Sequence, residues 1–272
     1  MRKIFNDFHP LTKLVFDVMM ILIVAITFFF IGTFLLSLIK GISFQEILKI
    51  SGDINGDIAT IKQSQVVYSL SIFFFPSLII AYFFDKNPLN FYKLNNSGAY
   101  FNYLNVIFLI IISVPIVNYL SQFNSGLNLP ASFSGVEKTM REMEDKAKIL
   151  TERLLNVSSI EQLLLNIFVI ALIPAIGEEL FFRGLIQKHL AEWFKNIHIA
   201  IFVTAIVFSV FHFQFFTFLP RVFLGIMLGY LFVWSKSLWL SIVAHFVNNA
   251  FAITAFYFMM KKGVPVEKIE NF

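Results

Sequence analysis

The residues best suited to chemistry lie in a short charged stretch inside an apolar part of the chain. Residues 174–184 read Pro-Ala-Ile-Gly-Glu-Glu-Leu-Phe-Phe-Arg-Gly, and their charges follow a run of 15 uncharged residues, Leu163–Gly177. Glu179 and Arg183 stand four apart in the acid-first order, so one helix face lets them neutralise each other. Glu178 points about 100° away on such a helix and gains no partner from this spacing. A carboxylate buried without a cation is a candidate general base.

Two later apolar stretches carry histidine. His212 lies within one of them, and His245 lies within another with Asn249 one helical turn further on. Polar groups in membrane spans face the interior of the bundle, so the three segments are able to converge on one site. A base, two imidazoles that hold water or donate hydrogen bonds, and a neutral amide donor suit water attack on a carbonyl group. The remaining histidines lie at span ends or outside spans and receive no role: His9, His189 and His198.

The same side chains allow other chemistries. Glu178, His212 and His245 could equally form a three-ligand Zn²⁺ site with an open position for water. We favour a metal-free site, because Glu178 then serves as the base and no further base is required. The motifs of other intramembrane proteases, H-E-x-x-H, G-x-S-x-G and G-x-G-D, are missing from the sequence. A purely structural reading treats the charges of residues 178–183 as an interfacial cap on a helix that enters water at Gly177.

The composition places these residues in a membrane protein. Of 272 residues, 58% are apolar and 14% are charged, whereas soluble domains have about 45–50% and about 25%. That much apolar surface does not fit inside a soluble protein of this size, so the excess faces the lipid bilayer. The absence of cysteine excludes disulfides and a cysteine nucleophile. No basic cluster is denser than the pair Lys261-Lys262, so no nucleic-acid partner is expected.

Seven apolar runs predict an all-α fold, a polytopic membrane bundle of about seven to eight transmembrane helices. Five runs reach about 20 residues, the length a helix needs to cross the bilayer, and two are shorter, as helices buried among others are. The seven runs are Val18–Ile39, Val66–Phe84, Tyr100–Leu120, Leu163–Gly177, Ile197–Pro220, Val222–Ser235 and Leu238–Met260.

The runs divide the chain into four parts. Residues 1–120 hold N-terminal transmembrane helices, 121–160 form a polar segment, 161–260 form the core that carries the site, and 261–272 form a tail. Within the polar segment, apolar residues spaced four and three apart predict an amphipathic helix at 135–157. Its five acidic and five basic residues balance, which favours docking on protein over a membrane surface. Its own bundle, a second copy and a substrate are the three candidate partners.

Taken together, the polar residues of the core resemble a known family motif. The CPBP family of intramembrane proteases, which includes CAAX prenyl endopeptidases and the bacteriocin-processing Abi proteins, carries E-E-x-x-x-R, F-x-x-x-H and H-x-x-x-N/B, each on a separate span. This chain reads Glu178-Glu179-x-x-x-Arg183, Phe208-x-x-x-His212 and His245-x-x-x-Asn249 in the same order. The resemblance covers about residues 160–255.

This resemblance implies a helical core of about eight spans and hydrolysis of a peptide bond in or beside the membrane. Carried over by motif position, Glu178 would activate the water, His212 would help to hold it, and His245 with Asn249 would form the oxyanion site. Two further motif residues, Glu179 and Arg183, would support that geometry. The family is often labelled metalloprotease, while a metal-free glutamate mechanism is also argued for it, so no cofactor is assigned and Zn²⁺ or another divalent metal stays open.

We therefore predict an intramembrane endopeptidase acting on a membrane-anchored peptide or protein, embedded in the plasma membrane of a bacterium as a multi-pass protein. Two rival classes stay open. A non-catalytic membrane scaffold or bacteriocin immunity protein would share the fold, since some relatives are associated with self-immunity. A proton-coupled transporter would use the glutamate and histidines as a relay, but the paired broken helices of repeated halves are not found in the sequence.

Overall fold

The computed structural model describes residues 7–97 and 100–264, and over these residues the chain is helical without any β-strand. The predicted all-α membrane bundle is confirmed. Six helical stretches are long and apolar enough to cross a membrane, and a seventh apolar helix, Ile197–Val210, is shorter. The six are Pro10–Lys40, Ile58–Phe84, Asn102–Ser125, Ile160–Phe194, Phe215–Ser235 and Leu238–Lys261. Each of the seven predicted runs overlaps one of these segments.

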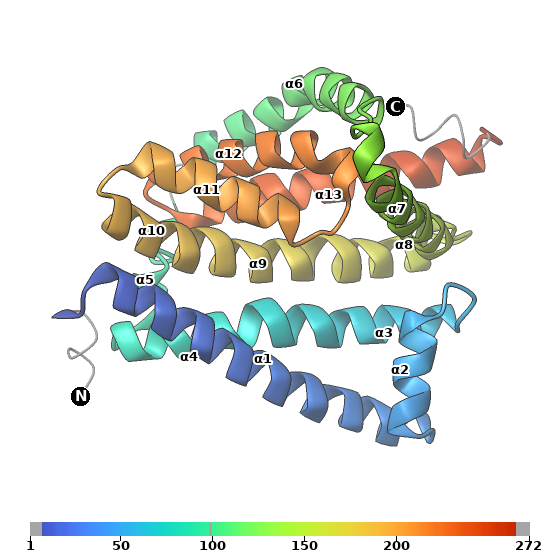
Figure 1. Ribbon diagram of the computed structural model, residues 1–272, viewed down its shortest axis with the longest axis horizontal. Coiled ribbons are helices and arrows are strands. Elements are labelled where there is room, and N and C mark those ends of the chain that lie inside the picture. Colours follow the sequence, from blue (N-terminus) through green and yellow to red (C-terminus); the bar gives the residue numbers. More distant parts are fainter. Residues whose placement is uncertain (1–6, 98–99, 265–272) are drawn as a thin grey trace.

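The N-terminal elements form one side of the bundle and an outer arm. In chain order they are α1 (Pro10–Lys40), α2 (Phe44–Gly52), α3 (Ile58–Ser69), η2 (Leu70–Phe74), α4 (Phe75–Phe84), α5 (Pro88–Phe91), α6 (Tyr100–Ser125), η3 (Ala131–Phe133) and α7 (Ser134–Leu155). Helices α1 and α3–α4 lie together on one side of α9, whereas α6 crosses the opposite side of the molecule (Figure 1).

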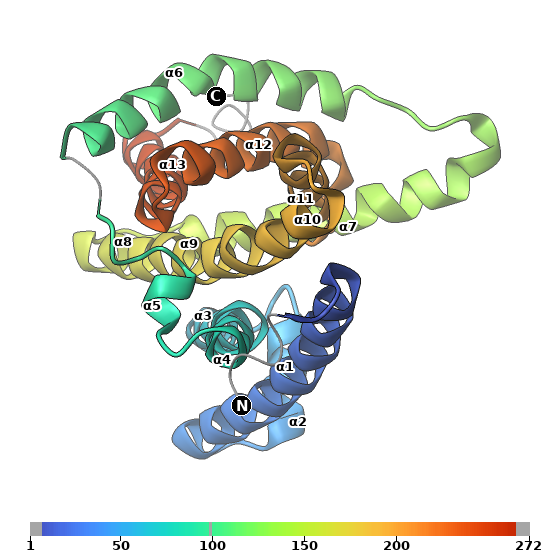
Figure 2. The same cartoon turned by 90° about the vertical axis from the view of Figure 1, so that its left-hand side faces the viewer.

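The remaining elements form the core that carries the predicted site. They are α8 (Ile160–Asn166), η4 (Ile167–Leu172), α9 (Ile173–Glu179), η5 (Leu180–Ile186), α10 (Gln187–Phe194), α11 (Ile197–Val210), η6 (Phe215–Thr217), α12 (Phe218–Ser235) and α13 (Leu238–Lys261). Figure 2 shows the continuous rod from α8 to α10 between the N-terminal helices and the group α11–α13, with α6 outermost. The rod is therefore in contact with helices on both sides.

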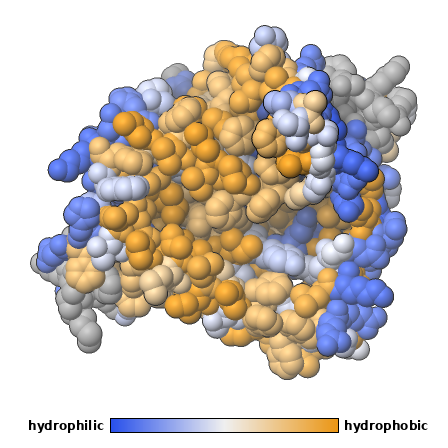
Figure 3. Space-filling model, in the orientation of Figure 1, coloured by the Kyte–Doolittle hydropathy of each residue, from blue (hydrophilic) through white to orange (hydrophobic). Residues whose placement is uncertain are grey.

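The surface agrees with a bilayer around this bundle. A broad apolar face covers the middle of the molecule, and hydrophilic residues gather toward its two ends (Figure 3). In Figure 1, which has the same viewing direction, the long helices run between those two ends. Exposed side chains of α1 are large and apolar, among them Leu22, Ile26 and Phe30. Such a band is what lipid-facing helices require.

Three π-helical turns interrupt the spans, and proline explains two of them. Pro76 follows η2 and Pro174 follows η4, each in the first turn of the next α-helix. Proline has no N–H to donate to the carbonyl four residues back, and the preceding residue bonds five residues back instead, as Ile173 N–H does to Phe168 O. The third π-turn, η5, holds Arg183 and has no proline. Such widened turns often occur at functional sites.

Two glycines allow helices to approach closely beside the charged stretch. A Cβ on Gly184 would lie 2.3 Å from a ring carbon of Tyr92, and a Cβ on Gly225 would lie 2.9 Å from the Cβ of Ala205. Larger residues would push α5 away from η5, and α12 away from α11. Tyr92 is itself fixed, because its hydroxyl donates to the backbone oxygen of Ser77 at 2.6 Å.

The polar segment contains the predicted amphipathic helix, with bounds close to the predicted 135–157. Helix α7 lies against its own chain: Leu154 is buried, Arg153 donates to Gly56 O at 3.3 Å, and the Arg141 guanidinium lies 4.1 Å from the Phe216 ring centroid. Of the three candidate partners, its own bundle is the one this structure contains. In the predicted 261–272 tail, residues 265–272 lie outside the described residues.

The predicted run Ile197–Pro220 is not a single helix. Helix α11 ends at Val210, Phe213 adopts a left-handed conformation with φ of 51°, and α12 begins at Phe218. His212 therefore lies in a turn rather than in the middle of a span, which corrects the sequence-based position. The exposed backbone groups of this turn find partners in neighbouring helices: Asn124 of α6 donates to Phe215 O and accepts from the N–H of Leu219. This side-chain support makes irregular backbone tolerable at membrane depth.

Candidate active site

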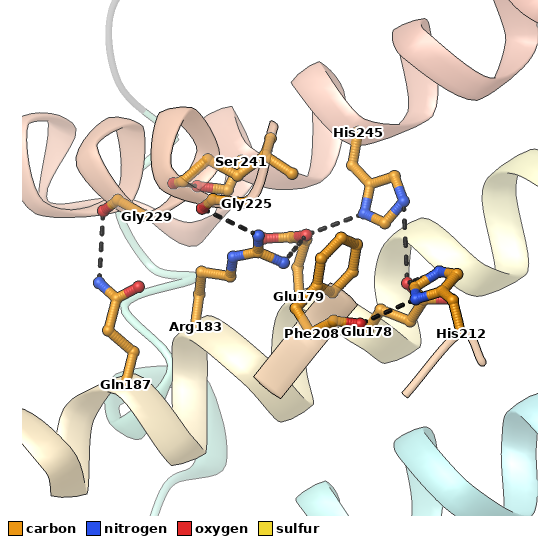
Figure 4. A network of polar contacts seen from close by, with 11 residues as sticks. Glu178, Glu179, Arg183, Gln187, Phe208, His212, Gly225, Gly229, Ser241 and His245 are labelled. Atoms are coloured by element: carbon orange, nitrogen blue, oxygen red, sulfur yellow. Dashed lines mark hydrogen bonds and ion pairs between the residues drawn. The ribbon is translucent and has the colours of Figure 1, made fainter. Parts of the chain in front are cut away.

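The fold brings the three predicted key side chains together from different elements. Glu178 comes from α9, His212 from the turn after α11, and His245 from α13. The Glu178 Oε2 atom lies 4.0 Å from His212 Nε2 and 3.9 Å from His245 Nε2. Figure 4 shows both imidazoles beside the carboxylate. The convergence expected from the sequence is thus present in the structure.

The second carboxylate of the motif has a different environment. Glu179 Oε1 accepts from Arg183 Nη1 at 2.7 Å and from His245 Nδ1 at 2.8 Å. The Glu179 and Arg183 side chains are 0% exposed, and Arg183 Nη2 also donates to Gly225 O at 3.1 Å. The predicted pair is therefore formed, and it ties three elements, η5, α12 and α13, to one buried carboxylate. Ion pairs without exposure need such additional hydrogen bonds to offset their desolvation.

Phe208 of the second motif supports three of these groups at once. Its ring centroid lies 4.6 Å from the Arg183 guanidinium carbon. The same ring meets the imidazoles of His212 and His245 edge-on, at centroid distances of 4.8 Å and 5.9 Å. Its backbone oxygen accepts from His212 Nδ1 at 2.8 Å. The F-x-x-x-H spacing thus places an aromatic support and a hydrogen-bond acceptor for the same histidine.

The hydrogen-bond partners define which ring nitrogen of each histidine faces Glu178. A backbone oxygen and an ionised carboxylate only accept, so Nδ1 carries the hydrogen in His212 and in His245. In the singly protonated ring, Nε2 then has a free lone pair. Both Nε2 atoms therefore face Glu178 as hydrogen-bond acceptors, and they donate only when the ring carries two hydrogens.

The three side chains open onto a cavity of about 630 Å³. Asn249 also lines this cavity, as the predicted oxyanion role requires. Its Oδ1 accepts from Asn248 Nδ2 at 3.2 Å, so the amide NH₂ of Asn249 is the group left to donate. Much of the remaining wall is apolar and includes Phe73, Val169 and Leu224. The cavity is thus an apolar space with a few convergent polar groups, the usual form of a small-molecule or peptide site.

Several polar residues of this cavity escaped the sequence analysis, among them Arg221 and Asn248. Arg221 had a visible signal, because it is the only Asp, Glu, Lys or Arg between residues 197 and 235. A charge within such a stretch is costly unless it serves a function or has a partner. Asn248 had no such signal, since its neighbour Asn249 carried the motif.

The atoms that face Glu178 are of the kind that bind a metal ion, but the distances between them are too long for a shared ion. Histidines that bind metal usually donate their other ring nitrogen to a carboxylate or backbone oxygen, as His212 and His245 do. Two ligands of one tetrahedral Zn²⁺ at about 2.0–2.1 Å would lie about 3.3 Å apart, whereas Glu178 Oε2 is 3.9–4.0 Å from each imidazole. Within the described part of the chain, no three His, Asp or Glu side chains form a group that could hold a metal ion. The site as observed does not fit a metal.

The histidines without a predicted role have structural partners. His9 caps α1 by accepting from the N–H of Leu11 at 3.3 Å, and His198 contacts the Tyr230 hydroxyl at 2.7 Å. His189 is buried and contacts Asp17 of α1 directly. None of the three lines the cavity that contains Glu178.

Fold and site together define an integral membrane protein with a buried carboxylate–imidazole site beside an apolar cavity. Residues 160–251 match the family described as type II CAAX prenyl endopeptidase Rce1-like. This segment contains all seven motif residues, and the match confirms the resemblance to the CPBP, or CAAX protease, family. The matched segment is about a third of the chain, and it is the part that carries the site. Neither the curated proteins nor the solved structures gave a match.

Proposed function

We propose that this protein is an intramembrane endopeptidase in which Glu178 activates a water molecule for attack on a peptide bond. One observation carries the proposal. The Glu178 Oε2 atom is buried without a hydrogen-bond partner and stands 3.9–4.0 Å from two imidazole nitrogens beside the cavity. That distance is too long for a direct hydrogen bond. A single water at about 2.8 Å from each atom would bridge it.

In the proposed reaction, the water donates one hydrogen to Glu178 and the other to the Nε2 lone pair of a histidine. Glu178 removes the first proton as the water oxygen attacks the scissile carbonyl carbon. The C–N bond then breaks, and protonated Glu178 returns its proton to the departing nitrogen. The products are a new carboxyl terminus and a new amine, and Glu178 ends as it began. His212 holds the water through this cycle.

The oxyanion formed on the carbonyl oxygen needs a hydrogen-bond donor. Asn249 is our candidate, because Asn248 occupies its Oδ1 and leaves its NH₂ to donate. His245 shares this role when both of its ring nitrogens carry hydrogen, because Nδ1 is engaged with Glu179 in either state. Glu179 and Arg183 act as positioning residues, which hold His245 at a fixed angle to Glu178 through their buried contacts.

The substrate we propose is a membrane-anchored peptide or protein. The family name refers to prenylated C-terminal CAAX peptides, and the apolar cavity wall is compatible with a substrate segment that carries a lipid or is itself apolar.

The direct test is cleavage in proteoliposomes. Purified protein is mixed with a library of peptides tethered by an apolar segment or a lipid, and new termini are identified by mass spectrometry. We expect cleavage at defined bonds, and none with a matched preparation of Glu178→Gln. Absence of cleavage by wild-type protein across the library would overturn the proposal and favour the scaffold or immunity role.

A further inference from the structure

A second cavity of about 770 Å³ lies next to the one that contains Glu178. It is bounded by α6, α7 and the turn that precedes α12. The two cavities share four lining residues: Thr151, Leu155, Arg221 and Ala252. The two cavities therefore adjoin each other at these residues.

The walls of the second cavity differ in chemistry from those of the first. The second cavity presents hydroxyl, amide and charged side chains from two helices, among them Ser121, Gln122, Glu144 and Asp145. A hydrophilic peptide loses its water when it leaves solvent, and these side chains replace the lost hydrogen bonds whereas lipid does not. The first cavity, apart from its catalytic candidates, is largely apolar. The second cavity is thus the more polar of the two.

The boundary between the two cavities is held in place. Arg221 Nη1 donates to Thr217 Oγ1 at 2.6 Å and to Gln214 O at 3.3 Å. From α7, Glu144 accepts from the same Thr217 hydroxyl and from the N–H of Phe216 at 3.2–3.3 Å. Because the turn after His212 is fixed from both sides, the junction keeps a fixed charge pattern beside the site.

We infer that the second cavity binds a hydrophilic substrate segment on one side of the scissile bond. The inference rests on the proposed function, because an endopeptidase holds its substrate on both sides of the bond it cuts. Because Arg221 lines both cavities, a peptide whose scissile bond lies at Glu178 extends past this shared wall into the second cavity. The substrate class is then a chain with an apolar anchored segment joined to a hydrophilic one, cut near the junction.

The absence of cysteine from the protein allows a reversible block of this cavity. Ser121→Cys introduces a single thiol on its wall, and a bulky methanethiosulfonate reagent then fills the space. Three peptides with the same anchored segment and scissile bond are compared: one has a hydrophilic flank on the amino side, one has it on the carboxyl side, and one is truncated to a few residues on each side.

We expect the block to lower kcat/KM about tenfold for one of the flanked peptides, chiefly through KM, and to leave the truncated peptide unchanged. Reductant removes the block and restores the rate. Ile116→Cys, on the half-exposed apolar face of the same helix, receives the same reagent and serves as the matched control.

Each other outcome has a definite meaning. Equal loss for flanked and truncated peptides would overturn the inference, because the cavity would then serve the site as a whole. No loss for either flanked peptide would overturn it as well. Failure of the unmodified wild-type protein to cut any of the three would refute the proposed function itself, before the block is applied.

Discussion

Two regions of this protein bury a carboxylate beside a histidine, and they differ in what lies between the two groups. Asp17 of α1 contacts His189 of α10 directly, and both residues are almost fully buried. Beside them, Lys13 donates to Glu192 at 2.8 Å. Neither Asp17 nor His189 lines either cavity. This cluster joins the first helix to the core.

At Glu178 the same residue types are held apart. His245 is engaged by Glu179, and His212 is engaged by the backbone oxygen of Phe208. These contacts stop each imidazole 3.9–4.0 Å from Glu178 Oε2, and the gap opens onto a cavity. The comparison teaches that residue type does not separate a structural pair from a reactive one. Direct contact gives Asp17 and His189 each a hydrogen-bond partner. The gap between Glu178 and its two histidines leaves room for water and substrate.

The largest expected effect is on catalysis at the gap. Glu178→Gln keeps the shape of the side chain and removes the base, so kcat should fall by about 10²–10⁴. The free energy of unfolding should hold or rise, because a neutral amide is cheaper to bury than an unpaired carboxylate. Cleavage rate and thermal unfolding in one detergent measure the two effects. Unfolding of this variant would show that Glu178 is structural and would remove the contrast with Asp17.

The next effect is on stability, at the neighbouring residue. Glu179→Gln removes the charge that faces Arg183 and weakens the acceptor of His245, and breaking a buried pair costs about 3–5 kcal/mol. Arg183→Gln should cost a similar amount. The double variant should be more stable than the sum of the two losses predicts, and a double-mutant cycle measures this coupling. Additive losses would mean that the two side chains do not act as a pair.

A smaller effect should follow from disrupting the pair in direct contact. Asp17→Leu deprives His189 of its acceptor and should lower the free energy of unfolding by about 1–3 kcal/mol. Asp17→Asn is the matched control, since its amide oxygen still accepts a hydrogen bond. In the protein that stays folded, kcat/KM should match wild type for both variants. A selective loss of kcat with normal stability would give the first cluster a role in the reaction.

Much of this arrangement was predictable from the sequence. The apolar runs indicated the helices, and the four-residue spacing from Glu179 to Arg183 indicated the pair that forms. The convergence of Glu178 and His245 followed from the rule that polar groups in spans face inward, whereas His212 reaches the site from a turn. These predictions depend on local periodicity and on the cost of charge in lipid, both of which a sequence displays.

The rest depended on contacts between distant segments. The break at Phe213 has no glycine or proline to announce it, and partners on α6 and α7 stabilise the turn. The Asp17–His189 contact joins residues 172 positions apart, so no spacing rule reaches it. The second cavity, which Arg221 also lines, depends on how α7 packs against the core. Tertiary packing decided each of these features.

The smallest expected effect comes from metal removal. The imidazoles present lone pairs toward Glu178, as metal ligands do, yet they stand about 0.6 Å wider than a shared tetrahedral Zn²⁺ would hold them. A bridging water fits the distance from Glu178 Oε2 to each imidazole, whereas a shared metal ion does not. Prolonged dialysis against a strong chelator should therefore change kcat by less than about twofold. Loss of cleavage on chelation, with recovery on addition of stoichiometric Zn²⁺ but not Mg²⁺, would show that the three side chains close around a metal. The gap at Glu178 would then be a ligand site rather than a water site. The contrast with Asp17 and His189 would remain, because only the residues held apart could bind the ion.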